Sequence, residues 1–89
     1  MKLRFHRTVR DKIWQKHQVR LYEVLEAIRD PRRRTFVSHD EPEGRVYLLL
    51  GRSEAGRLLR IIFISRRNGN WMKTALDAYE RDKKAYNKK

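Results

Sequence analysis

The sequence contains no cysteine, only two prolines and only four glycines among its 89 residues. Without cysteine, a disulfide framework and a thiolate metal site are excluded, and we expect the protein to act in a reducing cytoplasm. The longest apolar runs, Val46–Leu50 and Ile61–Ile64, are far shorter than the roughly 20 residues of a membrane-spanning helix. The opening residues MKLRFHR lack the apolar segment of a signal peptide. We therefore expect neither a membrane anchor nor export.

The signatures of several enzyme classes are missing as well. The histidines, His6, His17 and His39, do not have the spacing of metal ligands. The chain contains no glycine-rich phosphate loop, no GxSxG nucleophile motif and no cysteine–histidine pair. These absences argue against zinc enzymes, nucleotide-cofactor enzymes and triad hydrolases, and we expect neither a cofactor nor a metal.

Acidic residues are scarce relative to basic ones. The chain has 23 Lys and Arg against 11 Asp and Glu, a formal net charge of +12. Residues 1–35 carry 11 basic against 4 acidic side chains, residues 36–55 carry 2 against 4, and residues 56–73 carry 5 against none. Two basic blocks around an acidic segment indicate one charged face rather than a basic tail. Such a face suits a polyanion, above all RNA; the alternative is a surface that only confers solubility.

Hydrophobic spacing predicts a single α+β domain over residues 1–89. Helical spacing indicates helices at 8–17, where Thr8 and Asp11 resemble a capping box, and at 21–28. A C-terminal helix is expected at 77–87, with Leu76, Tyr79, Lys83 and Tyr86 on one face. Strands are expected at 35–37, 46–50, 57–65 and 71–75, with residues 38–44 as a loop. We expect the helices to pack against a four-stranded antiparallel sheet.

Basic side chains and tyrosines at strand ends suit RNA cleavage without a metal. In that reaction the 2′-hydroxyl attacks the neighbouring phosphate, so the protein must move protons and stabilise added negative charge. We expect the hairpins at 52–56 and 68–70 to converge at one end of the sheet. The predicted catalytic residues are Arg52, Arg57, Arg66, Lys73 and Tyr86, and the predicted RNA-binding residues are Lys16, His17, Arg67, Arg81 and Lys83. For any one of these, the alternative is an ordinary solvated charge, or a core-edge residue in the case of His17.

Several segments in order resemble the BrnT toxins of bacterial type II toxin–antitoxin modules. The matching segments are Lys16-His17-Gln18-Val19, Asp30-Pro31, Glu43-Gly44-Arg45, Tyr47–Gly51, Arg52–Leu59, Thr74–Asp77 and Asp82–Tyr86. Three positions depart from the family pattern: Gln18 replaces a glycine, Leu76 an arginine and Asp82 a glutamate. The resemblance covers roughly residues 9–86.

The resemblance implies a RelE-like fold and a ribonuclease that inhibits translation. It also implies a cognate antitoxin as partner, with operator DNA bound only through the complex. The loss of the family arginine at Leu76 implies reduced activity unless another cation, such as Lys73 or Arg81, replaces it. A second interpretation is a non-catalytic RNA-binding or ribosome-associated module. A DNA-binding regulator is the weaker third, because the second helix contains Glu23 and Glu26.

Overall fold

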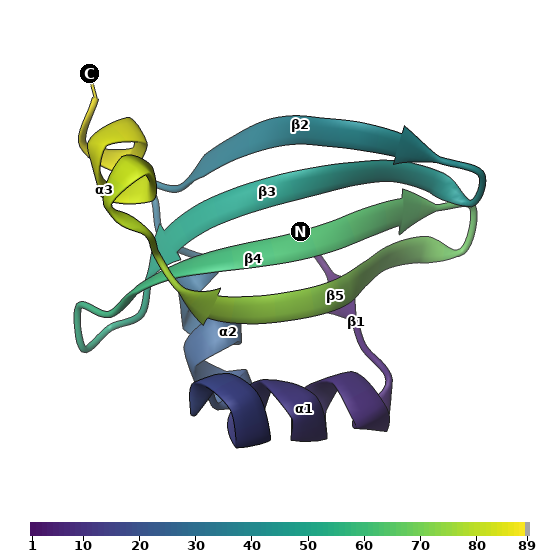
Figure 1. Ribbon diagram of the computed structural model, residues 1–89, viewed down its shortest axis with the longest axis horizontal. Helices are drawn as coiled ribbons and strands as arrows, with labels where there is room; N and C mark the ends of the chain where they lie inside the picture. The colour runs from purple at the N-terminus through teal and green to yellow at the C-terminus, as the bar shows by residue number, and fades with distance from the viewer. Residues whose placement is uncertain (89) are drawn as a thin grey trace.

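The computed structural model describes residues 1–88 of the chain as two N-terminal helices, a five-stranded sheet and a C-terminal helix (Figure 1). The elements in order are β1 (Leu3–Arg4), α1 (Arg7–His17), α2 (Leu21–Ala27), β2 (Arg34–Glu41), β3 (Gly44–Arg52), β4 (Leu58–Arg66), β5 (Gly69–Asp77) and α3 (Glu80–Asn87). The predicted α+β class and the order of helices around the sheet are confirmed. None of the helices within residues 1–88 is long and apolar enough to span a membrane.

The sheet has the strand order β1-β5-β4-β3-β2. Strands β2 to β5 form an antiparallel meander, as expected, but β1 adds a fifth, parallel strand through the pairs Leu3↔Asn70 and Arg4↔Trp71. The expectation of four antiparallel strands therefore missed β1. Two residues are too few to show an alternating pattern, and their partner lies far away in the sequence.

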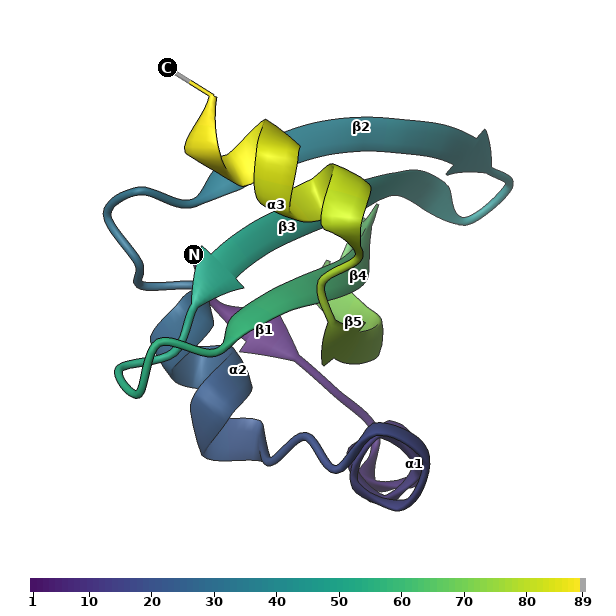
Figure 2. The same ribbon diagram turned by 60° about the vertical axis from the view of Figure 1, so that its left-hand side comes forward.

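The main core lies between the sheet and the two N-terminal helices, which cover the same face (Figures 1 and 2). Leu49, Ile61 and Ala75 are cross-strand partners on this face, and they pack with Ile13 of α1 and Val24 of α2. All five are at most 2% exposed. This packing accounts for the helical spacing of apolar residues in α1 and α2.

The opposite face of the sheet is covered at one end only, by α3 (Figure 2). Tyr86 of α3 packs with Leu50 and Leu58 in a second, smaller cluster. This end is where β3 finishes and β4 begins. Helix α3 therefore lies beside the β3–β4 turn and brings its basic side chains there.

Several predicted boundaries were wrong. Strand β2 continues through residues 38–41, which were expected to form a loop, and a register shift between Val37 and His39 marks a β-bulge within it. The sequence does not indicate this part of the strand, because residues 38–41 lie at the edge of the sheet, are mostly exposed and lack alternating apolar residues. Helix α3 starts at Glu80, because β5 extends to Asp77 and Leu76 pairs with Arg60 in the sheet. Leu76 and Tyr79 are therefore not on the helical face with Lys83 and Tyr86.

The predicted capping box at the start of α1 was also wrong. The N-cap residue is His6, and no side chain caps the helix. The turn at 52–56 is confirmed, with Gly56 at a φ of 90°, a left-handed conformation that favours glycine.

Candidate functional site

The two hairpins expected to converge lie at opposite ends of the sheet. Consecutive turns of a meander alternate between ends, and β4 separates the turn after Arg52 from the turn after Arg66. At about 3.3 Å per residue, the nine-residue strand holds them roughly 25 Å apart. The prediction that Arg66 and Arg67 join Arg52 and Arg57 in one site is therefore wrong.

Arg57 is held by structural contacts at the β3–β4 end. Its Nε donates to Asp77 Oδ1 at 2.7 Å, and its Nη1 donates to Glu23 Oε1 at 3.1 Å. The same guanidinium donates to the carbonyl oxygens of His17 and Gln18 at 3.0 and 2.8 Å. The hydrogen bond to Asp77 raises the pKa of Arg57 above its ordinary value, against the opposing effect of burial, so its charge is permanent. Arg57 thus joins α1, α2 and β5, and its donors are already occupied.

The Arg57–Asp77 pair lies beside a hollow of about 320 Å³ to which Arg52, Asp77 and Lys83 contribute. The hydrogen bond from Arg57 lowers the pKa of Asp77; burial opposes this, and the charges of Arg57, His17 and Lys83 lower it further. Two predicted site residues, Arg52 of β3 and Lys83 of α3, line this hollow, and the carbonyl of His17 at the end of α1 is hydrogen-bonded to Arg57 beside it.

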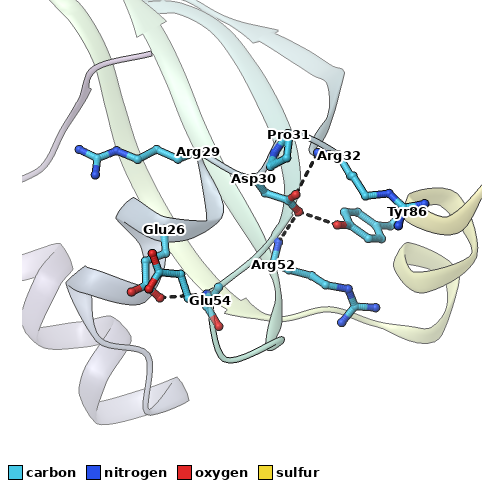
Figure 3. A pocket seen from close by; sticks show the side chains of 9 residues that line it. Glu26, Arg29, Asp30, Pro31, Arg32, Arg52, Glu54 and Tyr86 are labelled. Atoms are coloured by element: carbon cyan, nitrogen blue, oxygen red, sulfur yellow. Dashed lines mark hydrogen bonds between the residues drawn. The ribbon is translucent and has the colours of Figure 1, made fainter.

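A second hollow of about 410 Å³ shares Arg52 with the first (Figure 3). Asp30 lies at its centre and accepts hydrogen bonds from the Tyr86 hydroxyl at 2.5 Å and from the backbone amides of Arg52 and Arg32 at 2.8 and 2.9 Å. Burial alone would raise the pKa of Asp30, but these three hydrogen bonds together leave it below its ordinary value. Burial raises the pKa of Tyr86, and its bond to Asp30 raises it further. At neutral pH, Tyr86 is therefore a hydrogen-bond donor and Asp30 a carboxylate.

The Arg52 side chain is exposed between the two hollows. Its Nη1 donates to the Gly56 carbonyl at 2.7 Å, and its guanidinium carbon lies 5.2 Å from the centre of the Tyr86 ring. A guanidinium has five N–H donors, so donors remain for a ligand. Lys83 is also exposed, with its Nζ 3.1 Å from Glu80 Oε1 on the same helix. Such exposed pairs contribute little, so both cations can contact a bound anion.

The remaining predicted residues are placed as follows. Lys16 is exposed near the end of α1, next to His17, and Arg81 is exposed on α3 with its guanidinium 5.5 Å from the Tyr79 ring centre. Lys73 lies on β5 and pairs with Glu41 at 2.9 Å, away from the β3–β4 end. Arg66 and Arg67 are exposed at the far end.

Sequence reasoning missed the acidic partners of the site. No local pattern in the sequence indicates that Asp30 binds Tyr86 or that Glu23 and Asp77 bind Arg57. Asp30 is 56 positions from Tyr86, and Asp77 is 20 positions from Arg57. Only the fold brings these pairs together. Together the two hollows are lined by equal numbers of basic and acidic residues, and among the basic ones Arg52, which both hollows share, and Lys83 are exposed cations that can hold a phosphate group.

A scan of the chain against protein-family models finds no match, and no curated protein matches its sequence. The fold is compatible with the RelE-like arrangement that the BrnT resemblance implies, since two N-terminal helices, a sheet and a C-terminal helix follow in that order. The chain is accordingly described by its α+β fold and by the site at the β3–β4 end, where exposed cations lie beside hydrogen-bonded and ion-paired carboxylates.

Proposed function

We propose that this protein is a metal-independent endoribonuclease that acts as a toxin by cutting RNA and inhibiting translation. The observation that carries the proposal is the hollow beside Asp77, which Arg52 of β3 and Lys83 of α3 line together. His17, at the end of α1, is next to this pair of elements because its carbonyl accepts a hydrogen bond from Arg57, the partner of Asp77. Arg57 and Tyr86, predicted to be catalytic, instead position this centre through Asp77 and Asp30.

The proposed reaction begins with attack of the RNA 2′-hydroxyl oxygen on the adjacent phosphorus. The imidazole of His17 takes the hydroxyl proton, and Arg52 holds the phosphate oxygens as negative charge develops on them. The bond between phosphorus and the 5′-oxygen then breaks, and the leaving oxygen takes a proton from the Lys83 ammonium. The products are a 2′,3′-cyclic phosphate and a free 5′-hydroxyl, and solvent restores both side chains.

The proposed toxin is neutralised by an antitoxin that covers this end of the sheet. Charge complementarity requires acidic residues opposite Arg52 and Lys83, with apolar residues to hold the complex when salt screens the charges. Operator DNA would be bound through that complex.

The test is cleavage of a short RNA in the presence of EDTA, with the product ends identified by mass spectrometry. We expect cyclic phosphate ends, and we expect no cut where a 2′-deoxynucleotide replaces the attacking ribose. Replacing His17 by Ala, or Arg52 and Lys83 together by Ala, should lower the rate by about 100-fold or more. The variant Arg66→Ala with Arg67→Ala removes the same charge at the far end and should keep the rate. Equal losses in the two double variants would refute the proposed centre.

The second candidate is a non-catalytic RNA-binding module. It is favoured by the commitment of Arg57 and Tyr86 to structural contacts, because two of the predicted catalytic groups are then unavailable for chemistry. In this case the Arg52 and Lys83 variants would weaken RNA binding, but the wild type would leave RNA intact and induced expression would not arrest bacterial growth.

A further inference from the structure

A third hollow lies on the helical side of the molecule, outside the proposed cleavage centre. It measures about 310 Å³, lies where α1 connects to α2, and is lined by Trp14, Leu21 and Tyr22 together with Arg10, Asp11 and Arg20. We propose that this hollow is a stacking site for the bases of single-stranded RNA. The proposal deepens the proposed function, because it rests on RNA being the ligand.

The two aromatic rings are exposed although a fully buried core residue lies close to them. Trp14 is 42% exposed and Tyr22 is 60% exposed, whereas the neighbouring Val19 is fully buried. Large aromatic side chains on the surface are the groups on which proteins stack unpaired bases. The rings therefore form an exposed aromatic surface rather than part of the core.

Arg20 strengthens the case for a nucleic-acid ligand. Its guanidinium carbon lies 3.7 Å from the centre of the Trp14 ring, which is stacking distance. A guanidinium over one face of the indole offers N–H donors beside the ring to the phosphate of a nucleotide whose base would stack on the other face.

The charge around the hollow suits the same ligand. Residues 7–20 carry five Lys and Arg but only one acidic residue, Asp11, which accepts a weak 3.5 Å contact from Arg10. A single strand of RNA uses both the charges and the rings, because each nucleotide has a phosphate and an aromatic base.

The hollow lies next to the proposed cleavage centre along α1. Trp14 and His17 are three residues apart in α1, so they are neighbours on the helix surface. An RNA strand with its scissile phosphate at His17 would continue past Trp14. Since duplex RNA hides the faces of its bases, the hollow selects single strands.

The experiment uses the full chain with Trp71→Phe, so that Trp14 is the only tryptophan. The probe is a 2′-O-methyl oligonucleotide of roughly 10 nucleotides, which cannot be cut because its 2′-hydroxyls are blocked. We expect it to quench Trp14 fluorescence, and we expect an abasic oligonucleotide of equal charge to bind without quenching. Trp14→Leu should weaken binding of the base-bearing probe by about 10-fold, and Trp14→Phe should restore most of it.

Equal weakening of the base-bearing and abasic probes by Trp14→Leu, or binding without quenching, would overturn the stacking site. So would a Trp14→Leu variant that differs only in self-association, since the hollow would then be a protein contact. Because the probe cannot be cut, these results do not depend on catalysis. Quenching by the probe without cleavage of ordinary RNA would support the stacking site while refuting the ribonuclease.

Discussion

At the scale of single residues, Asp30 holds together three parts of the chain. Its carboxylate accepts hydrogen bonds from the backbone of Arg32 in its own loop, from the backbone of Arg52 at the end of β3, and from the Tyr86 hydroxyl of α3. Tyr86 is 8% exposed, so its hydroxyl has little water to replace this partner. The position of Arg52, and with it the proposed cleavage centre, depends on this carboxylate.

Replacing Tyr86 by Phe should lower the free energy of unfolding at pH 7 by about 1.5–3 kcal/mol, because a hydrogen bond to a charged group is lost. The matched control is Tyr79→Phe, since the Tyr79 side chain is 47% exposed. Thermal unfolding of both variants and the wild type measures the difference. Equal melting temperatures for Tyr86→Phe and the wild type would show that water replaces the tyrosine.

The same variant should change the dependence of stability on pH. The folded pKa of Asp30 is lowered, so the unfolded chain binds more protons in acid and the contribution of Asp30 is lost as pH falls below about 4. The folded pKa of Tyr86 is raised, so the folded protein holds its proton longer and stability is lost as pH rises above about 10. Tyr86→Phe should remove the alkaline loss due to Tyr86 and reduce the acid loss due to Asp30.

The cations of the site were predictable from the sequence, but their roles were not. Arg52, Arg57 and Lys83 were identified because basic residues at turns and on an exposed helix suit phosphate binding. Arg57 differs from Arg52 only through its neighbours, since Glu23 and Asp77 flank one guanidinium while the other is exposed. Those neighbours are distant in sequence, and no local pattern indicates them.

At the scale of elements, β3 and α2 make a close backbone contact at Gly51. A Cβ atom at this position would lie 2.2 Å from the Ala27 carbonyl oxygen at the end of α2. Gly56, in the turn that follows, has open space around it but a φ of 90°. The two glycines are therefore required for different reasons, one for contact and the other for conformation.

Gly51→Ala should destabilise the protein by about 3 kcal/mol, because backbone must move away from backbone. Gly56→Ala should cost about 1–2 kcal/mol, the penalty for a left-handed conformation. Urea unfolding curves with unchanged slopes would measure both losses as shifts of the midpoint. Equal midpoints for the two variants would mean that α2 can shift away from residue 51 at little cost, so that the close backbone contact does not require glycine.

The elements most visible in the sequence are those with a buried face. Strands β3 and β4 were predicted from their apolar runs, and α1 and α2 from helical spacing, with boundaries within two residues. Strand β2 was predicted only at Thr35-Phe36-Val37, because the residues from Ser38 to Glu41 pair along the edge of the sheet without entering the core. Hydrophobic patterns report burial, and hydrogen bonding without burial is invisible to them.

At the scale of the whole molecule, the charge is divided between two ends of the sheet and the outer surface of α1. The proposed RNA path uses Arg52 and Lys83 at one end and Arg10 and Arg20 beside the third hollow. Arg66 and Arg67 lie outside that path. The number of phosphate contacts, measured from the salt dependence of RNA binding, therefore distinguishes a defined RNA path from binding spread over the whole positive surface.

The affinity for single-stranded RNA should fall with salt, with a log–log slope of about −3 for four phosphate contacts. Replacing Arg52 and Lys83 by Ala should reduce the magnitude of the slope by about 1.4, because two contacts are lost. Replacing Arg66 and Arg67 by Ala should leave it unchanged. Titrations at several salt concentrations measure the slope, and similar reductions in the two variants would indicate a diffuse surface.

The parallel pairing of β1 with β5 has a consequence for synthesis on the ribosome. The hydrogen bonds within α1, α2 and the β2–β3 hairpin are local and can form as the chain emerges, whereas the apolar faces of the two helices are covered only when the sheet forms. Leu3, however, pairs with Asn70, so β1 must wait until β5 has left the exit tunnel. Until then, the edge of β4 that will pair with β5 is open to chaperones and to other chains. The strand β1, which is made before every other strand of this sheet, is thus the last to find its partner.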